Sequence, residues 1–92
     1  MELTSKRRAE LKAEAHKIDS VAHIGKFGAT PESLAHIDKA LNDHQLIKVK
    51  FLGFKERKGE LSEEIAGATS STVIDIIGNV AILYREKPLV SE

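Results

Sequence analysis

Gly25 and Gly28 form a G-x-x-G pattern around Lys26 and Phe27, and these four residues are the chain's best candidates for a chemical role. Glycine reaches positive φ freely and leaves room for a ligand to approach the backbone. Thr30 then caps a predicted helix, whose first turn offers unpaired amides and the positive end of the helix dipole. A short apolar run, a glycine loop and a capped helix, in this order, favour a phosphate-binding loop.

The spacing of the two glycines narrows the class of ligand. Neither the mononucleotide loop G-x-x-x-x-G-K-S/T nor the dinucleotide loop G-x-G-x-x-G occurs in the chain. A four-residue G-x-x-G loop instead grips the backbone of single-stranded RNA or DNA in KH-type binders, and the Phe27 ring could stack on a base. The alternative is a plain turn with Phe27 folded back onto the core, and the residues alone leave both interpretations open.

The four histidines do not form a metal-binding or catalytic pattern. His36 and His44 are eight positions apart on one predicted helix, and a zinc pair needs i, i+4 spacing. His16 and His23 fall on two other elements, and no nucleophile elbow or Ser-His-Asp pattern is visible. A chain of 92 residues also has little room for an enclosed catalytic pocket. We therefore expect no enzymatic activity, no metal and no cofactor.

The net charge is zero, with 14 Lys/Arg against 14 Asp/Glu, but the charges are unevenly placed. Residues 1–58 hold 12 of the basic and 8 of the acidic residues, and residues 59–92 carry the opposite excess. A basic half permits a basic face, which is the usual footprint of a polyanion partner. The alternative is that the two halves of the sequence do not form two faces in space.

Length and composition predict one soluble domain over residues 1–92, with residues 87–92 as a frayed tail. No apolar run approaches the ~18 residues that span a membrane, and the N-terminus lacks the apolar core of a signal peptide. Cysteine is absent, which excludes disulfides and cysteine–zinc sites. We expect a cytoplasmic protein without membrane contact.

Three helices and four strands are expected to position the glycine loop. The helices begin at Thr4 or Ser5, at Thr30, and near Gly59, and the strands cover 21–24, 46–51, 73–77 and 80–84. The two-residue link 78–79 predicts a hairpin between the last two strands. The buried positions that we expect on the helices are Leu11, Ala15 and Ile18; Leu34, Ile37, Ala40 and Leu41; and Leu61, Ile65 and Ala68.

The strand 46–51 alternates between apolar and basic residues. Ile47, Val49 and Phe51 point to one side, and Lys48 and Lys50 point to the other with Leu46. Two lysines on one face predict that helices cover only the opposite face of the sheet. Asp75 alternates with two isoleucines, so we expect it to face solvent.

Blocks along the chain resemble the YhbY family of small bacterial proteins, which are stand-alone versions of the plant CRM (chloroplast RNA splicing and ribosome maturation) domain. The resemblance covers about residues 3–86 in constant order. The matching residues are Leu3-Thr4-x-Lys6 with Arg7, Leu11 and Ala15-His16; Ile24-Gly25-Lys26-Phe27-Gly28; Leu34 and Ile37-Asp38-x-Ala40-Leu41; His44-x-Leu46-Ile47-Lys48-Val49-Lys50; Ala66; and Ile77-Gly78 with Leu83-Tyr84-Arg85.

The resemblance implies an α/β fold of order α-β-α-β-α-β-β with a mixed four-stranded sheet, similar to the C-terminal domain of translation initiation factor 3, and a KH-like G-x-x-G loop. It also implies RNA binding, in precursors of the large ribosomal subunit. The implied RNA contacts are Gly25, Lys26, Phe27 and Gly28 of the loop and Lys6, Arg7, Arg8, Lys48 and Lys50 of a basic face. The chain departs from the family at Asn79, often basic, and at Phe27, usually small or polar.

The function that we expect is therefore that of a monomeric RNA-binding accessory factor in ribosome assembly, with rRNA as its partner. The alternative is a protein-interaction module, whose exposed surfaces dock onto another protein of the ribosome or of a different complex without contacting RNA.

Overall fold

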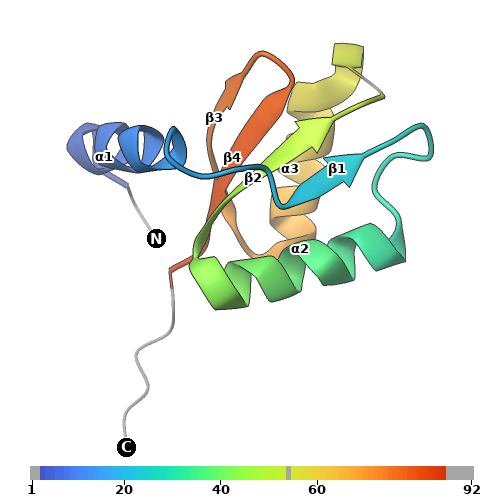
Figure 1. The fold of residues 1–92 in the computed structure, drawn as a ribbon, viewed down its shortest axis with the longest axis horizontal. Coiled ribbons are helices and arrows are strands. Elements are labelled where there is room, and N and C mark those ends of the chain that lie inside the picture. The colour runs from blue at the N-terminus through green and yellow to red at the C-terminus, as the bar shows by residue number, and fades with distance from the viewer. Residues whose placement is uncertain (1–2, 54, 87–92) are drawn as a thin grey trace, which may run out of the picture.

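The computed structural model of the chain describes residues 3–53 and 55–86, so the predicted frayed tail 87–92 lies outside the described residues. The elements are α1 (Ser5–Ala15), β1 (Ala22–Ile24), α2 (Pro31–His44), β2 (Leu46–Phe51), the 3-10 turn η1 (Lys55–Arg57), α3 (Lys58–Thr69), β3 (Thr72–Ile77) and β4 (Val80–Tyr84) (Figure 1). The strands form one sheet in the order β1-β2-β4-β3. The β1–β2 pair is parallel and the other two pairs are antiparallel, which confirms the predicted mixed α/β fold.

Two of the helix starts follow directly from capping residues. The Thr4 hydroxyl accepts a hydrogen bond from Arg7 N at 3.0 Å, and the Thr30 hydroxyl accepts one from Ser33 N at 3.1 Å. Pro31 occupies the first position of α2, where its missing N–H costs nothing. These contacts confirm the two predicted starts, and α2 ends at His44.

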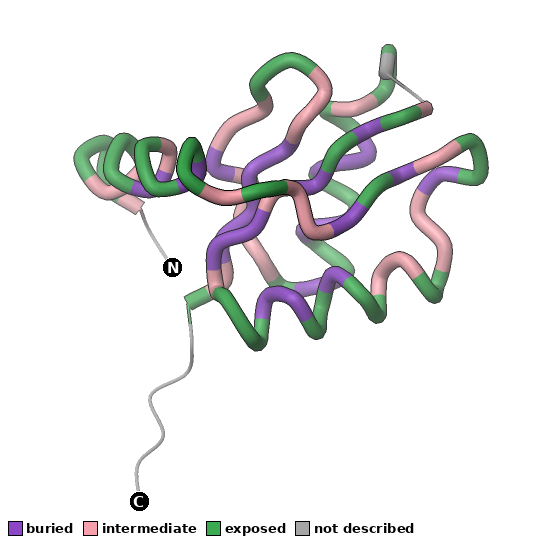
Figure 2. The backbone as a smooth tube through the Cα atoms, in the orientation of Figure 1, coloured by how far each residue is buried: buried purple, intermediate pink, exposed green. Residues whose placement is uncertain are grey.

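The main core lies between the sheet and the helices α2 and α3. Ile47, Val49 and Phe51 of β2 are fully buried there, as predicted, against Ile37 of α2 and Ile65 of α3. Figure 2 shows the buried stretches along the strands and the inner sides of these helices. The side chains of this cluster exclude water from that face of the sheet.

One expected core residue of α3 is placed differently. Ala68 is exposed, whereas Ala66 and Thr69 are buried with Leu61 and Ile65. At 3.6 residues per turn, the buried arc runs from Leu61 round to Ala66, and Ala68 falls just outside its Leu61 side. The seven-residue spacing from Leu61 was therefore the wrong guide at this end of the helix.

The prediction that helices cover only the face opposite the lysines is wrong. Leu11 and Ala15 of α1 pack on the lysine side of the sheet, where they form a second cluster with Leu46 of β2 and with Ile82 and others of β3 and β4. This side is apolar at its α1 end, so it must be covered even though β2 contributes two lysines. The cover is partial, since His23, Lys50 and Ile77 remain exposed.

Within the described part of the chain, no helix is both long and apolar enough to cross a lipid bilayer.

Candidate nucleic-acid interface

The glycine loop lies at the end of the sheet where β1 and β2 both finish, because these two strands are parallel. The chain after β2 lies beside it, with Leu52 N donating to Ile24 O at 2.8 Å. The β3–β4 turn reaches the same end, where Phe51 N donates to Asn79 O at 2.7 Å. We call residues 25–30, 52–53, 55–57 and 78–79 the loop end of the sheet; in Figure 1 it faces the top and right of the view.

The two glycines of the loop stand there for different reasons. Gly28 has φ 70°, and its N–H donates to Gly25 O at 3.1 Å, so the turn needs a residue without a side chain at this position. Gly25 is not in the left-handed region, and a Cβ built on it would meet nothing within 4 Å. The fold therefore requires glycine at 28 but makes no demand for it at 25.

Phe27 points away from the protein. Its side chain is 78% exposed, and the Lys26 ammonium lies 5.1 Å from the centroid of its ring. The alternative in which Phe27 folds back onto the core is therefore wrong. An exposed ring beside a free cation is a suitable partner for a base and its phosphate.

The N-terminus of α2 offers fewer amides than the sequence suggested. Pro31 has no N–H, and the N–H of Ser33 is already bonded to the Thr30 hydroxyl. Glu32 adds a carboxylate in the first turn, which stabilises the helix but opposes an anion. The end of α2 is therefore a poorer phosphate site than its position after the loop suggests.

Gly53 lies directly against the backbone of the glycine loop, and the sequence did not predict this contact. A Cβ on Gly53 would lie 3.1 Å from Gly25 O and 3.3 Å from Lys26 N. The N–H groups of Leu52 and Gly53 both donate to Ile24 O, at 2.8 and 3.1 Å. The available signal was a glycine directly after a strand that pairs in parallel with the strand before the loop, since such a glycine often marks a close backbone approach.

The cations after β2 are partly engaged. Arg57 Nε donates to Glu60 Oε2 at 3.1 Å, and this hydrogen bond lowers the pKa of Glu60, so the pair stays ionised at neutral pH and its charges offset. Lys58 Nζ donates to Gly78 O and ties α3 to the β3–β4 turn. Arg57 thus belongs to the loop end, and Lys58 follows it directly and contacts the loop end at Gly78.

The structure does not bring the predicted cations of α1 to the loop. α1 stands at the opposite side of the molecule from the β1–α2 connection (Figure 1), and the exposed Lys6 lies in its first turn. Arg8 donates to Val73 O and Ile74 O, both at 3.2 Å, and Arg7 lies 5.6 Å from the centroid of the Tyr84 ring. These two arginines brace α1 against the sheet.

The two predicted lysines of β2 differ in the same way. Lys48 is half-buried and donates to Ala15 O at 3.1 Å, which ties β2 to the end of α1. Lys50 is exposed and lies one residue from the end of β2, next to the loop end. Of the five predicted basic-face residues, Lys50 is thus the one that the structure brings close to the glycine loop.

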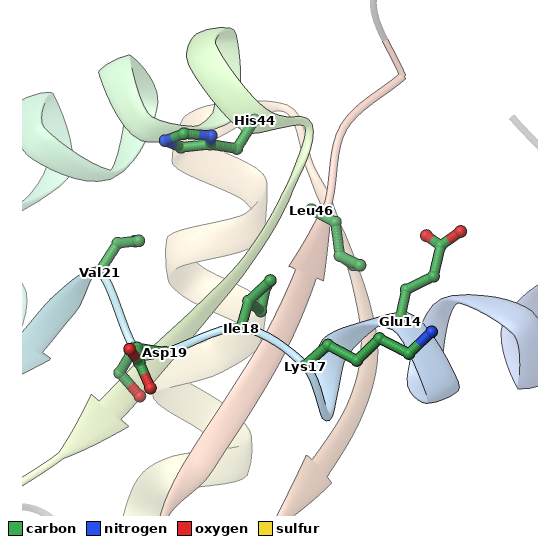
Figure 3. Close-up of a pocket in the computed structure, with 8 residues that line it drawn as sticks. Glu14, Lys17, Ile18, Asp19, Val21, His44 and Leu46 are labelled. Atoms are coloured by element: carbon green, nitrogen blue, oxygen red, sulfur yellow. The ribbon is translucent and has the colours of Figure 1, made fainter.

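A hollow lies away from the loop, where the segment after α1 passes the end of α2. Figure 3 shows Glu14 and Lys17 on one side of it and His44 on the other. Its volume is about 540 Å³, and it is lined by Glu14, Lys17, Ile18, Asp19, Ser20, Val21, His44 and Leu46. The two carboxylates do not suit a polyanion, and the described residues hold no group of three metal-ligating side chains.

The sequence profile of the CRS1/YhbY (CRM) domain family matches residues 3–85 of the chain. The chain belongs to this family. The match confirms the resemblance seen in the sequence, and it includes the glycine loop and every strand of the sheet.

Individual relatives agree with this membership. A Pseudomonas aeruginosa protein named "Probable RNA-binding protein" is 34% identical over 89 residues, which cover 96% of this chain and 86% of the relative. A Haemophilus influenzae protein named "RNA-binding protein" is 38% identical over 84 residues, 90% of this chain and 85% of the relative. The solution structure of a Staphylococcus aureus protein, described as a candidate RNA-binding protein, matches with TM-score 0.83 and 35% identity over 98% of this chain and 95% of its own.

Proposed function

We propose that this protein binds RNA at the loop end of the sheet, without catalysis, and that the glycine loop is the primary contact. The names of its relatives support RNA as the partner. The observation that carries the role of the loop is Gly25, where the fold places no steric or conformational demand for glycine. A residue without a side chain at an open position suits a backbone that a ligand must approach closely.

The exposed groups of the loop divide the contact between backbone and base. Lys26 supplies a positive charge for a phosphate, and Phe27 supplies a flat face on which a base can stack, a contact worth roughly 1–3 kcal/mol. Phosphate contacts position a nucleic acid without reading its sequence. Binding should therefore be weakly sequence-specific and sensitive to salt.

A pair of glycine substitutions tests the loop. Gly25→Asp places a carboxylate where the RNA backbone should lie, and Gly67→Asp makes the same change in α3, where a Cβ also meets nothing within 4 Å. We expect Gly25→Asp to weaken RNA binding by about tenfold or more, equivalent to ~1.4 kcal/mol, and Gly67→Asp to leave it unchanged. Circular dichroism and urea unfolding verify that both variants are folded.

Either of two results would overturn the proposal for the loop. One is equal RNA affinity of the two aspartate variants in filter binding or fluorescence anisotropy. The other is wild-type binding that does not weaken as salt rises, because contacts with phosphates release counterions and make log K fall with log salt.

The finer proposal is that the RNA is rRNA in precursors of the large ribosomal subunit, and that the protein acts there as a cytoplasmic monomer folded as one domain. The basis is the family membership together with the exposed loop. Sedimentation of cell extracts should place the protein with pre-large-subunit particles, and the Gly25→Asp variant should leave them. If a partner protein stays bound after complete nuclease digestion, and the Gly25→Asp variant also stays bound to that partner, the result favours the protein-interaction alternative.

A further inference from the structure

A row of four side chains crosses the whole sheet next to the loop end. His23 of β1 is paired with Lys50 of β2, Lys50 with Val80 of β4, and Val80 with Ile77 of β3. Paired residues point to the same side of a sheet, so all four lie on the side that α1 covers only in part. We call these four residues the open row.

The open row is accessible and continues into a hollow. His23, Lys50 and Ile77 are exposed and Val80 is half-buried, because α1 packs farther along the strands, against Leu46, Ile74, Ile82 and Tyr84. Ile77 is 43% exposed, which is unusual for a large aliphatic side chain in a strand. A hollow of about 130 Å³ extends from the row toward α1, and its lining residues are Ala15, His16, Lys48, Ile77, Val80 and Ile82.

The chemistry of the row suits an unpaired polynucleotide strand. Lys50 offers an ammonium group for a phosphate, the His23 ring can stack on a base, and Val80 and Ile77 form an apolar floor. The row holds no carboxylate, and Asp75, which lies two residues before Ile77 on β3, is paired with Lys12 at 2.9 Å. With strands ~4.8 Å apart, the row is about 14 Å across, which is enough for more than one nucleotide.

The row is also continuous with the loop end. His23 lies two residues before Gly25, and Ile77 and Val80 flank the turn that bonds to the end of β2. A strand held at the glycine loop therefore has a direct route onto the sheet. In Figure 1 neither α2 nor α3 crosses this side, since α3 lies behind the sheet and α2 along its lower edge.

We propose that the open row is a second RNA subsite, which carries the unpaired strand that leaves the glycine loop. The inference rests on the proposed function and extends the site from one loop to the uncovered half of the sheet. It makes the preferred ligand a single strand longer than the loop alone can hold, because a paired duplex cannot place its bases against His23 and Ile77.

The test is the dependence of affinity on RNA length. Unstructured oligoribonucleotides of about 4 to about 16 nucleotides, the range of site sizes of single OB-fold domains, are titrated against the wild type, Lys50→Ala and Ile77→Ser. Lys39→Ala is the control, since this exposed lysine of α2 faces Asp43 at 3.0 Å and its loss changes the net charge equally. Circular dichroism verifies the fold of each variant.

We expect the affinity of the wild type to rise with length. Lys50→Ala and Ile77→Ser should remove this gain and leave the shortest binding oligonucleotide unaffected. For the longest one, Lys50→Ala should also reduce the slope of log K against log salt by about 0.7, the value for one phosphate contact to a single strand. Lys39→Ala should behave as the wild type.

The outcomes separate the two proposals. A length-dependent gain that persists in Lys50→Ala and Ile77→Ser overturns the open row and leaves the loop intact. Absence of RNA binding by the wild type at every length overturns the proposed function itself. Loss of a nuclease-resistant protein partner in the row variants, with unchanged RNA affinity, overturns the row as an RNA subsite and makes it a protein-docking surface.

Discussion

Replacing Gly53 by alanine tests whether the chain after β2 holds the glycine loop in place. The new Cβ would lie 3.1 Å from Gly25 O, 3.2 Å from Gly25 C and 3.3 Å from Lys26 N. Ordinary contacts of this kind begin near 3.4 Å, so the two segments must separate by a few tenths of an ångström. The hydrogen bonds from Leu52 N and Gly53 N to Ile24 O are the ones that this movement lengthens.

The magnitude follows from two opposed effects. Overpacking costs about 1–3 kcal/mol, and the half-buried site at the end of a strand should lie near ~1.5 kcal/mol. Loss of backbone freedom in the unfolded chain returns about 0.5 kcal/mol. The net loss of ~1 kcal/mol should lower Tm by about 4–8 °C in a chain of this size. Displacement of the loop should weaken RNA binding about three- to tenfold, or ~0.7–1.4 kcal/mol.

Calorimetry and fluorescence anisotropy measure the two effects, with Gly67→Ala as the matched control. A Cβ on Gly67 meets nothing within 4 Å in the interior of α3, so this variant should be more stable by about 0.5–1 kcal/mol and bind RNA normally. If Gly53→Ala matches the wild type in both measurements, the contact does not restrain the loop. If stability falls while affinity is unchanged, the position of the loop does not control binding.

Three further changes test the framework around the site. Arg85 donates four hydrogen bonds that tie β4 to α2 and α3. Arg85→Lys keeps the charge but loses the planar guanidinium, so it should lower the free energy of unfolding in urea by about 2 kcal/mol. An unchanged midpoint of urea unfolding refutes this. The Lys12 ammonium, then Ile76 N–H, lowers the pKa of Asp75 below its ordinary 3.8, so its stabilisation is present above that pH and is lost as pH falls through the lowered value. Wild type and Asp75→Asn should therefore differ in unfolding free energy near neutral pH and converge in acid, and a difference constant with pH contradicts the ion pair. Ser70 follows α3 at φ 54°, in the left-handed region that glycine adopts at lower cost. Ser70→Gly should therefore raise the free energy of unfolding by roughly 0.5–1 kcal/mol and raise Tm with it. A lower Tm would show that the serine is not strained.

Local signals in the sequence were sufficient to find the three α-helices and the four strands, although not the 3-10 turn η1. Thr4 and Thr30 indicate helix starts because their hydroxyls can accept hydrogen bonds from backbone amides of the first turn. The alternation of apolar and basic residues over 46–51 predicts both ends of β2 correctly. The Gly78-Asn79 link lies between two strands as expected, with Gly78 at φ 59°. Each of these patterns involves only a few neighbouring residues, so it can be recognised in the sequence without knowledge of the fold.

Local patterns did not predict that α1 covers the lysine side of the sheet. Two lysines on one side of β2 suggested an open face, but a lysine can bury its stem and still reach a polar group, as Lys48 does at Ala15 O. What places α1 is the apolar surface of Leu46, Ile82 and Tyr84, contributed by two strands that are far apart in sequence. Periodicity within one element carries no information about that pairing.

The site was predicted in the same uneven way. The glycine loop lies where the sequence put it, but the direction of Phe27 and the contact of Gly53 depend on the packing of β1 against β2. The basic residues of α1 are expected to form a cationic face for RNA, but Arg8 donates its hydrogen bonds to backbone carbonyls of β3. A count of charges in a stretch of sequence does not show which of them are already bonded.

This distribution of free and bonded cations has a measurable consequence for RNA binding. Among the described side chains near the loop, Lys26 and Lys50 are exposed, Arg57 is paired with Glu60, and Lys58 is bonded to Gly78 O. About two phosphate contacts to a single strand predict a slope of log K against log salt near −1.4. If Lys6, Arg7 and Arg8 of α1 also touched the RNA, about five contacts would predict a slope near −3.5. A chain of zero net charge can bind a polyanion only through such local groups, so a steep slope would show that the RNA reaches across the sheet to α1, and a shallow one would confine it to the loop end and the open row.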